Sequence, residues 1–489
     1  MTKIKKGLLS NSLFRRCYII CLFACNVSYV HFVGFVCLAL MLIWGGFLAV
    51  YNEVTRRTAL KTRYGFWLTA ILFSSALTLL FNVLNNALLN FVFLLHLAII
   101  FFIYYAVHTE KRLNFHRELY GVCRMIVYIS TVLGIIGLAL LVIGVDFEYL
   151  DVKFIIYENR FTGLYTNPNY LGFCAVTALF CCHMLIKKDL LQKSGCRRIS
   201  RIWLASCVAV NGISLALCDS NGATILLVSY AFFFVLYKMF GTESKFSFKQ
   251  IVIKSLATVL AGVVIVSSIF LLRTVCQLGF AELVKEKQTV TAPVEIKPDT
   301  NKPPAVTFDH ENKNLDSGRL TLWDQGKELF LTNPALGIGK GNIYTYGLDK
   351  FENGVKFSDR YRELKFGPFQ LGPFMTDLHN GYLTVLVSAG AIGFLLFAVF
   401  GARFFFSTTK HVLRDESLQD SVFPCMYSFL CAYLIYSFIE VTLLFNITFT
   451  IVFFWMILGY TSCFLTRNKP DHPIGHFTIF GKKFRKTLF

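Results

Sequence analysis

The chain has 489 residues, of which 55% are apolar and 16% charged, and Phe alone occupies 51 positions. An average soluble domain carries about 25% charged residues, and a soluble globule of this size could not bury so much apolar surface. The composition therefore excludes a cytosolic enzyme, a disordered chain and a secreted disulfide scaffold. It leaves a membrane protein that crosses the bilayer several times.

The net charge is +19, and the basic residues that give it lie between apolar runs and form no nucleic-acid-binding patch. Residues 273–378 hold 14 basic and 14 acidic residues, so the whole excess lies in the short connections elsewhere. The positive-inside rule produces this distribution, because Lys and Arg are retained on the cytoplasmic side. We therefore expect membrane lipids as neighbours and no nucleic-acid partner.

The apolar runs predict an all-α integral membrane protein with about 12 transmembrane helices, each of which needs roughly 20 residues. The runs cover residues 14–30, 32–51, 65–82, 87–107, 122–145, 167–186, 202–217, 221–238, 251–272, 379–402, 421–441 and 444–465. Between the first two runs, Asn26, Ser28 and His31 predict a tight turn inside one uncharged stretch.

Basic residues mark alternate connections, which places both termini in the cytoplasm and the long polar stretch outside. The expected parts are an N-terminal membrane region of about nine helices (1–272), a large external loop between helices 9 and 10 (273–378), a C-terminal membrane region of about three helices (379–466) and a basic cytoplasmic tail (467–489). Residues 282–316 are rich in charge and Pro, and we expect them to be a mobile insertion.

The 15 cysteines lie almost entirely in predicted helices and form no C-x-x-C pair, which favours small apolar packing over a metal site. An acidic cluster of Asp146, Glu148 and Asp151 offers oxygen ligands for magnesium, but it contains no Asp-x-Asp. We expect no metal and no other cofactor.

Three outer segments carry candidate chemistry, and the first contains Arg160 and residues 162–169. Asn167 is a candidate N-cap and Pro168 suits the first helical turn. The free N–H groups and the dipole of such a helix start favour an anion such as phosphate, and Arg160 would add a bidentate donor. The alternative is a plain capped helix with a solvated Arg160.

The second segment runs from Ser317 to Trp323, includes Arg319, and is followed by Asn333–Gly341 with its three alternate glycines. The glycines allow close approach of a backbone. This is no Walker A loop, because Gly341 follows Lys340 where Ser or Thr would hold magnesium. The alternative interpretation is a turn.

The third segment is Asp377-Leu-His379-Asn380, at the start of the tenth predicted helix. Asp377 is a natural N-cap, which would place His379 in the first turn. The helix dipole and a nearby Arg would lower the pKa of His379 and keep it neutral. A neutral imidazole accepts a proton from a hydroxyl. The alternative is an ordinary histidine at the membrane interface.

These segments together resemble the O-antigen ligase and polymerase family of bacterial envelope glycan synthesis. His379-Asn380, nine residues and Gly390-Ala-Ile-Gly393 fit H-[NSQ]-x9-G-x-x-G, and Arg160 to Leu164 fits R-x3-L. The Arg319 block with its glycines fits the remaining motif. One departure is Ser220-Asn221-Gly222, where many relatives carry Ser-Arg-Gly, so a cation expected near that outer turn is missing.

The resemblance implies a membrane glycosyltransferase of the C type in a bacterial cytoplasmic membrane. It implies a donor oligosaccharide on undecaprenyl diphosphate, a glycan or glycolipid acceptor, and transfer with inversion and without a metal. Arg160 and Arg319 would then hold the leaving diphosphate, and His379 would be the base. Substrate contacts are expected from Asn167, Asn169, Asn380, Gly339 and Lys340. A chain-length regulator and a flippase are further partners.

Two acceptors stay open, because the motifs do not separate a polymerase from a ligase that attaches the glycan to a lipid or protein. We favour the polymerase, since it is the more widely needed activity. A transporter or glycolipid flippase is the alternative of another class. It has little use for a long external loop and would need charges in the middle of its helices, whereas Glu440 and Asp219 lie near helix ends.

Overall fold

The computed structural model of the chain describes residues 7–28, 30–82, 86–144, 148–149, 152–153, 155–157, 160–240, 248–290, 319–351, 365–366, 369–370, 376–412, 418–467, 475–479 and 482–486. A helix occupies each of the twelve predicted spans. In chain order they are α2 (Asn11–Ala24), α3 (His31–Arg56), α5 (Gly65–Phe81), α6 (Ala87–Ile99) with its continuations η1 (Ile100–Tyr104) and η2 (Tyr105–Thr109), α7 (Phe115–Ile143), α8 (Pro168–Leu185), α10 (Arg201–Cys218), α11 (Asn221–Phe240), α12 (Phe248–Val290), α17 (Gly381–Val412), α18 (Phe423–Tyr436) and α19 (Phe449–Arg467).

Within the described residues, nine helices have the length and composition to cross a membrane. The helices α2, α5 and α18 are shorter, at 14, 17 and 14 residues. A mostly helical membrane protein is therefore confirmed, while the number of spans stays a prediction.

Short elements fill the connections, and among them are strands that the all-α prediction did not include. The short helices are α4 (Thr58–Lys61), α9 (Lys188–Ser194), α13 (Arg319–Thr332), η3 (Lys340–Asn342) and α14 (Ile343–Lys350). In the part of the chain that the structure describes, four antiparallel pairs join β1 (Glu148–Tyr149) to β2 (Val152–Lys153), β3 (Ile155–Tyr157) to β4 (Arg160–Gly163), β5 (Lys365–Phe366) to β6 (Phe369–Gln370), and β7 (Gly475–Ile479) to β8 (Lys482–Lys486). The pair β3–β4 is the important correction, because β4 begins at Arg160.

The ninth predicted span ends too early, because α12 continues to Val290 rather than stopping at residue 272. Residues 274–290 contain no Pro and a single Gly, and they are rich in Leu, Glu, Lys and Gln, which favour a helix. The first part of the predicted external loop is therefore helical. Residues 291–316 of the expected mobile insertion lie outside the described residues.

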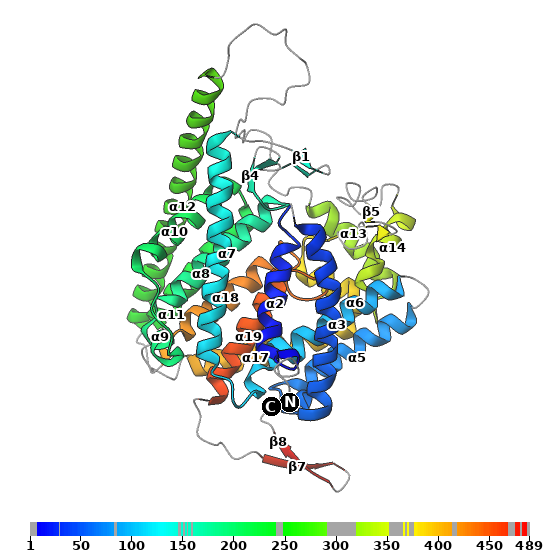
Figure 1. The fold of residues 1–489 in the computed structure, drawn as a ribbon. Coiled ribbons are helices and arrows are strands. Elements are labelled where there is room, and N and C mark those ends of the chain that lie inside the picture. Colours follow the sequence, from blue (N-terminus) through cyan, green and yellow to red (C-terminus); the bar gives the residue numbers. More distant parts are fainter. Residues whose placement is uncertain are drawn as a thin grey trace.

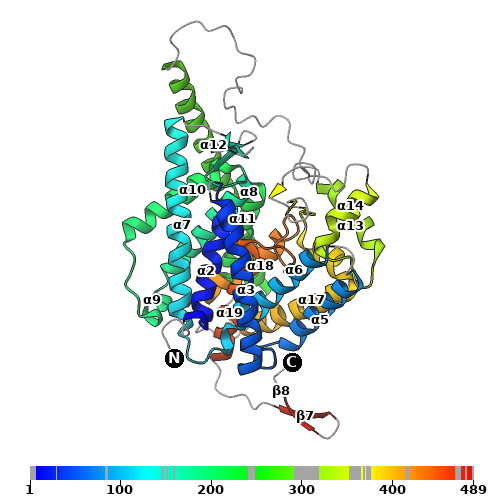
Figure 2. The ribbon, with the colours of Figure 1, turned by 45° about the vertical axis from the view of Figure 1, so that its right-hand side comes forward.

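The long helices run side by side, and the elements at their two ends differ (Figure 1). Both ends of the chain lie at one end of the bundle together with β7 and β8, while β4, α13 and α14 lie at the opposite end (Figures 1 and 2).

The core lies where α17, α19 and η1 meet, around a fully buried Trp455. Its ring centroid is 4.8 Å from that of Phe101 and 5.6 Å from that of Phe400. Such aromatic contacts add to the large apolar area that these rings bury. The Trp455 indole N–H donates to the Leu443 carbonyl at 2.8 Å, so the core also fixes the segment between α18 and α19.

A buried ion cluster joins α2 to α7 near the end of the bundle where the termini lie. Arg15 is fully buried, and its Nε and Nη2 each lie 2.9 Å from a carboxylate oxygen of Glu118. Its Nη1 donates to Glu110 at 2.7 Å. The structure thus buries Arg15 in a bidentate pair with Glu118.

The predicted turn between α2 and α3 is confirmed and contacts the segment that precedes α8. The Ser28 N–H donates to the Leu164 carbonyl at 2.9 Å, and the Thr166 N–H donates to the Asn26 carbonyl at 3.0 Å. These bonds hold residues 164–166, and with them the exit from β4 toward α8.

Candidate active site at the end of the bundle opposite the termini

In the first site segment, Arg160 begins β4 and its side chain reaches the start of α8. Asn167 is the N-cap, and its Oδ1 accepts from the Asn169 N–H at 2.7 Å, as the sequence predicts. Arg160 donates through Nη2 to Asn169 Oδ1 at 2.7 Å and through Nε to the Cys218 carbonyl at 3.0 Å. The guanidinium is thus held between the start of α8 and the end of α10.

The first turns of α8 and α11 pack directly on each other beside Arg160. Ser220 Oγ donates to Asn169 Oδ1 at 3.1 Å. A Cβ on Gly172 would lie 2.9 Å from the Cβ atoms of Ser220 and Ala223, so only a residue without a side chain permits this contact. Two positive helix ends and a guanidinium at one place favour an anion.

The glycine-rich segment binds the backbone of α17, which joins the second motif block to the third. The N–H groups of Ile338 and Gly339 donate to the carbonyls of Val387 and Ser388 at 3.0 and 3.1 Å. Gly390 has φ +66°, and a Cβ there would lie 2.3 Å from the Ala335 carbonyl oxygen. The predicted close approach is confirmed, with a helix backbone as the partner.

Lys340 lies inside the protein, where it is 2% exposed. Its Nζ donates to the Thr376 carbonyl at 2.5 Å. Burial lowers the pKa of Lys340, while the charge of Asp377 opposes that shift. The Gly339 N–H donates to the Ser388 carbonyl of α17. Gly339 and Lys340 are therefore placed to support the segment before His379, rather than to contact the substrate as expected from the sequence.

The third segment differs from the prediction at the start of α17. The helix begins at Gly381, and Asn380 acts as its cap, with Oδ1 accepting from the Leu383 N–H at 3.0 Å. His379 therefore precedes the helix instead of lying in its first turn. Its backbone has φ +43°, a strained conformation for a residue with a side chain.

Asp377 fixes this strained backbone without capping the helix. Its Oδ1 accepts from the His379 N–H at 3.0 Å, and its Oδ2 accepts from Asn446 Nδ2 at 3.3 Å. The Gly381 N–H donates to the Ser437 carbonyl at 2.7 Å. The position of His379 is thus set by the segment between α18 and α19.

Glu440, in that same segment, lies between His379 and Arg319. Its Oε2 is 3.0 Å from His379 Nδ1, and its Oε1 is 3.5 Å from Arg319 Nη2. The side chains of His379, Glu440 and Arg319 are 30%, 15% and 20% exposed, so the cluster stays accessible. A carboxylate on one ring nitrogen fixes the tautomer and orientation of an imidazole.

The charges around His379 reverse its predicted protonation. Burial lowers the pKa of His379, but the charge and hydrogen bond of Glu440, followed by the charge of Asp377, raise it to about 9, against the opposing charge of Arg319. Burial raises the pKa of Glu440, and His379 and Arg319 bring it below its ordinary value. The prediction of a lowered His379 pKa is wrong because it omitted a carboxylate that is distant in sequence.

Arg319 has an unused donor in this cluster. Its Nε is buried and has no hydrogen-bond partner among the described residues. A buried donor without a partner is costly, and a phosphate oxygen would satisfy it. This observation fits the predicted anion-binding role of Arg319.

The Arg160 region and the His379 region meet at the start of α11. A Cβ on Gly222 would lie 4.0 Å from Glu440 Cγ and 3.2 Å from the Tyr436 ring. The turn that binds Arg160 therefore packs on the segment that carries Glu440. The strand β4, which begins at Arg160, and the helix α13, which begins at Arg319, lie toward the same end of the bundle (Figure 1).

Sequence reasoning missed the role of Glu440, although one signal was present. Glu440 is the only charged residue between positions 421 and 466, and it lies at the end of the predicted span 421–441. Among the described residues, no group of three or more His, Cys, Asp or Glu could hold a metal ion. The side chains of Asp146, Glu148 and Asp151 lie outside what the structure describes.

The fold and this site define a helical, multi-pass membrane protein with an arginine- and histidine-containing site at one end of its bundle. Residues 205–398 match the family model named Wzy_C and described as O-Antigen ligase, which confirms the resemblance to the O-antigen ligase and polymerase family. The match supports a role of this type and a membrane glycosyltransferase-like enzyme of the bacterial inner membrane. No curated protein matches the chain significantly.

Proposed function

We propose that the protein transfers an oligosaccharide from undecaprenyl diphosphate at the outer face of the cytoplasmic membrane. The observation that carries the proposal is the cluster of His379, Glu440 and Arg319, packed against the helix start that binds Arg160. It combines a proton acceptor with cations for a leaving diphosphate.

The chemistry is a single displacement. The acceptor hydroxyl oxygen attacks the anomeric carbon while the bond to the diphosphate breaks, which inverts the configuration. Arg160 and Arg319 stabilise the negative charge that develops on the leaving diphosphate. Because they supply positive charge at the leaving group, the proposed step uses no metal.

His379 accepts the hydroxyl proton in this step. Since Nδ1 faces Glu440, Nε2 is the nitrogen that receives the proton. With its pKa raised to about 9, the imidazole carries a proton at rest in neutral solution and must lose it before it acts as a base. The rate should therefore rise as the pH approaches 9.

The proposed acceptor is a second lipid-linked repeat, which makes the reaction a polymerisation of surface polysaccharide. Ligation to a lipid or protein acceptor is the other outcome of the following test. A chain-length regulator and a flippase would act with a polymerase.

The test uses the purified full chain in lipid vesicles with an undecaprenyl-diphosphate-linked repeat, and the products are separated on a gel. A ladder of longer lipid-linked glycans supports a polymerase. A single shift of an added lipid or protein acceptor supports a ligase. EDTA should leave either product unchanged, and strong inhibition by EDTA would direct attention to Asp146, Glu148 and Asp151. Absence of transfer with every acceptor, although the protein is folded, would contradict the proposal.

A further inference from the structure

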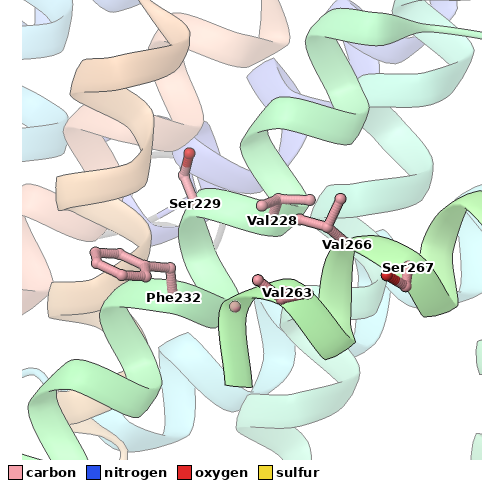
Figure 3. A pocket seen from close by; sticks show the side chains of 7 residues that line it. Val228, Ser229, Phe232, Val263, Val266 and Ser267 are labelled. Atoms are coloured by element: carbon pink, nitrogen blue, oxygen red, sulfur yellow. The ribbon is translucent and has the colours of Figure 1, made fainter. Parts of the chain in front are cut away.

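The helices α11 and α12 enclose an apolar groove of about 390 Å³. From α11, the side chains of Val228, Ser229 and Phe232 line it, and from α12 those of Val263, Val266 and Ser267 (Figure 3). Both helices have the length and composition to span a membrane. The groove therefore lies at membrane depth, and its lining suits a hydrocarbon chain.

Arg273 stands beyond one end of this groove. Asn221 precedes Val228 by seven residues on α11, and Arg273 follows Val266 by seven residues on α12. Seven helical residues span about 10 Å. Arg273 Nη1 donates to Asn221 Oδ1 at 3.3 Å, so the two helices are joined just above the groove, toward the candidate active site.

Arg273 brings a second guanidinium to the turn that already binds Arg160. It forms an ion pair with Asp219, while Arg160 binds the Cys218 carbonyl on the same turn. Two arginines and one aspartate leave a net positive charge of one among these three side chains. The first turns of α8 and α11 add their positive dipole ends at the same place.

We propose that the groove between α11 and α12 holds the polyprenyl chain of the lipid-linked donor and that Arg273 binds its diphosphate. The inference rests on the proposed function and assigns it a lipid-binding site. A cationic site above an apolar groove is complementary to an amphiphile with an anionic head and a hydrocarbon tail. The diphosphate would then lie beside Arg160, on the turn that packs against Glu440.

The test measures equilibrium binding of radiolabelled undecaprenyl diphosphate to the purified full chain in nanodiscs. Val263 and Val264 are adjacent on α12 and each is 57% exposed, but only Val263 lines the groove. Val263→Trp fills the groove and should weaken binding about tenfold or more, since affinity follows the apolar area buried. Val264→Trp is the matched control and should change binding less than about twofold.

The second arm tests the headgroup. Arg273→Gln should weaken binding of undecaprenyl diphosphate about ten- to a hundredfold, because a charge-assisted hydrogen bond is lost, and should leave binding of undecaprenol unchanged. If Arg273→Gln does not fold, because Asp219 loses its partner, Arg273→Lys keeps the charge. That variant should still bind the diphosphate more weakly, because an ammonium lacks the planar fork.

The outcomes separate this inference from the proposed function. If the wild-type protein binds the diphosphate but the two tryptophan variants bind it equally, the groove assignment is wrong while the proposed function stands. Equal loss of diphosphate and undecaprenol binding in Arg273→Gln would refute the headgroup role. If the wild-type protein binds no undecaprenyl diphosphate, the proposed function itself fails.

Discussion

Among the described residues, two clusters combine arginine and glutamate, and their geometry differs sharply. Arg15 and Glu118 are joined by two contacts of 2.9 Å, with side chains 0% and 2% exposed. Arg319 and Glu440 share a single contact of 3.5 Å, with side chains 20% and 15% exposed. The first pair is closed, and the second is accessible and also includes His379.

The difference is the reason why we assign a structural role to the first cluster and propose a chemical role for the second. In the Arg15 cluster the carboxylates of Glu118 and Glu110 take up Nε, Nη1 and Nη2 of the guanidinium, which leaves no room for a ligand. In the other cluster Arg319 Nε has no partner among the described residues, and Glu440 also holds an imidazole. A cluster with unused donors and partial exposure can bind a substrate.

The first prediction concerns the sides of the membrane that the two clusters face. A cysteine introduced by Thr300→Cys should react with an impermeant thiol reagent in intact cells, and one introduced by Phe480→Cys should not, because the Lys and Arg excess keeps the termini inside. Labelling is compared with the wild-type background. Reaction at 480 and none at 300 would invert the orientation.

The second prediction removes the base from the accessible cluster. His379→Ala should lower the transfer rate about 100- to 10,000-fold, the usual cost of losing a general base. His379→Gln keeps polarity and should be almost as slow. Undecaprenyl diphosphate binding should persist in both variants, since the imidazole serves the acceptor. Wild-type turnover in either variant would remove His379 from the mechanism.

The third prediction breaks the closed cluster. Arg15→Met should destabilise the protein by about 3–5 kcal/mol, because Glu118 is left buried without its counter-ion. Thermal unfolding in detergent measures this loss. Combining Arg15→Met with Glu118→Gln and Glu110→Gln should recover much of it, since no unpaired charge then remains. An unchanged unfolding temperature in the single variant would mean that the cluster is not structural.

The fourth prediction compares arginine with lysine in the accessible cluster. Arg319→Lys should reduce transfer about tenfold or more, because an ammonium cannot present the fork that matches two phosphate oxygens. Arg160→Lys should behave similarly, since Arg160 uses both Nε and Nη2 for its contacts. Lys327→Arg, on an exposed face of α13, is a control that should stay near wild type. Full activity in both lysine variants at normal expression would assign the arginines to other roles.

The sequence predicted elements whose cause is local and missed those that depend on distant contacts. The apolar runs located the helices, and Asn167 with Pro168 located the start of α8, because a cap and its helix are neighbours in the chain. The extension of α12 to Val290 was missed because the prediction ended the helix with its apolar run, although residues 274–290 favour a helix. The pairing of β3 with β4 was missed because a strand pair depends on its partner strand as well as on local sequence. The pKa of His379 was predicted in the wrong direction because Glu440 lies 61 positions away.

The pH dependence of transfer in vesicles tests the central claim, that His379 oriented by Glu440 is the base, most directly. The wild-type rate should rise with pH through about 9, where His379 loses its proton. Glu440→Gln removes the charge that raises this pKa, so the rise should move to lower pH, and the plateau should fall because the imidazole loses its orienting partner. Profiles that are independent of pH, or identical in the two proteins, would contradict the assignment.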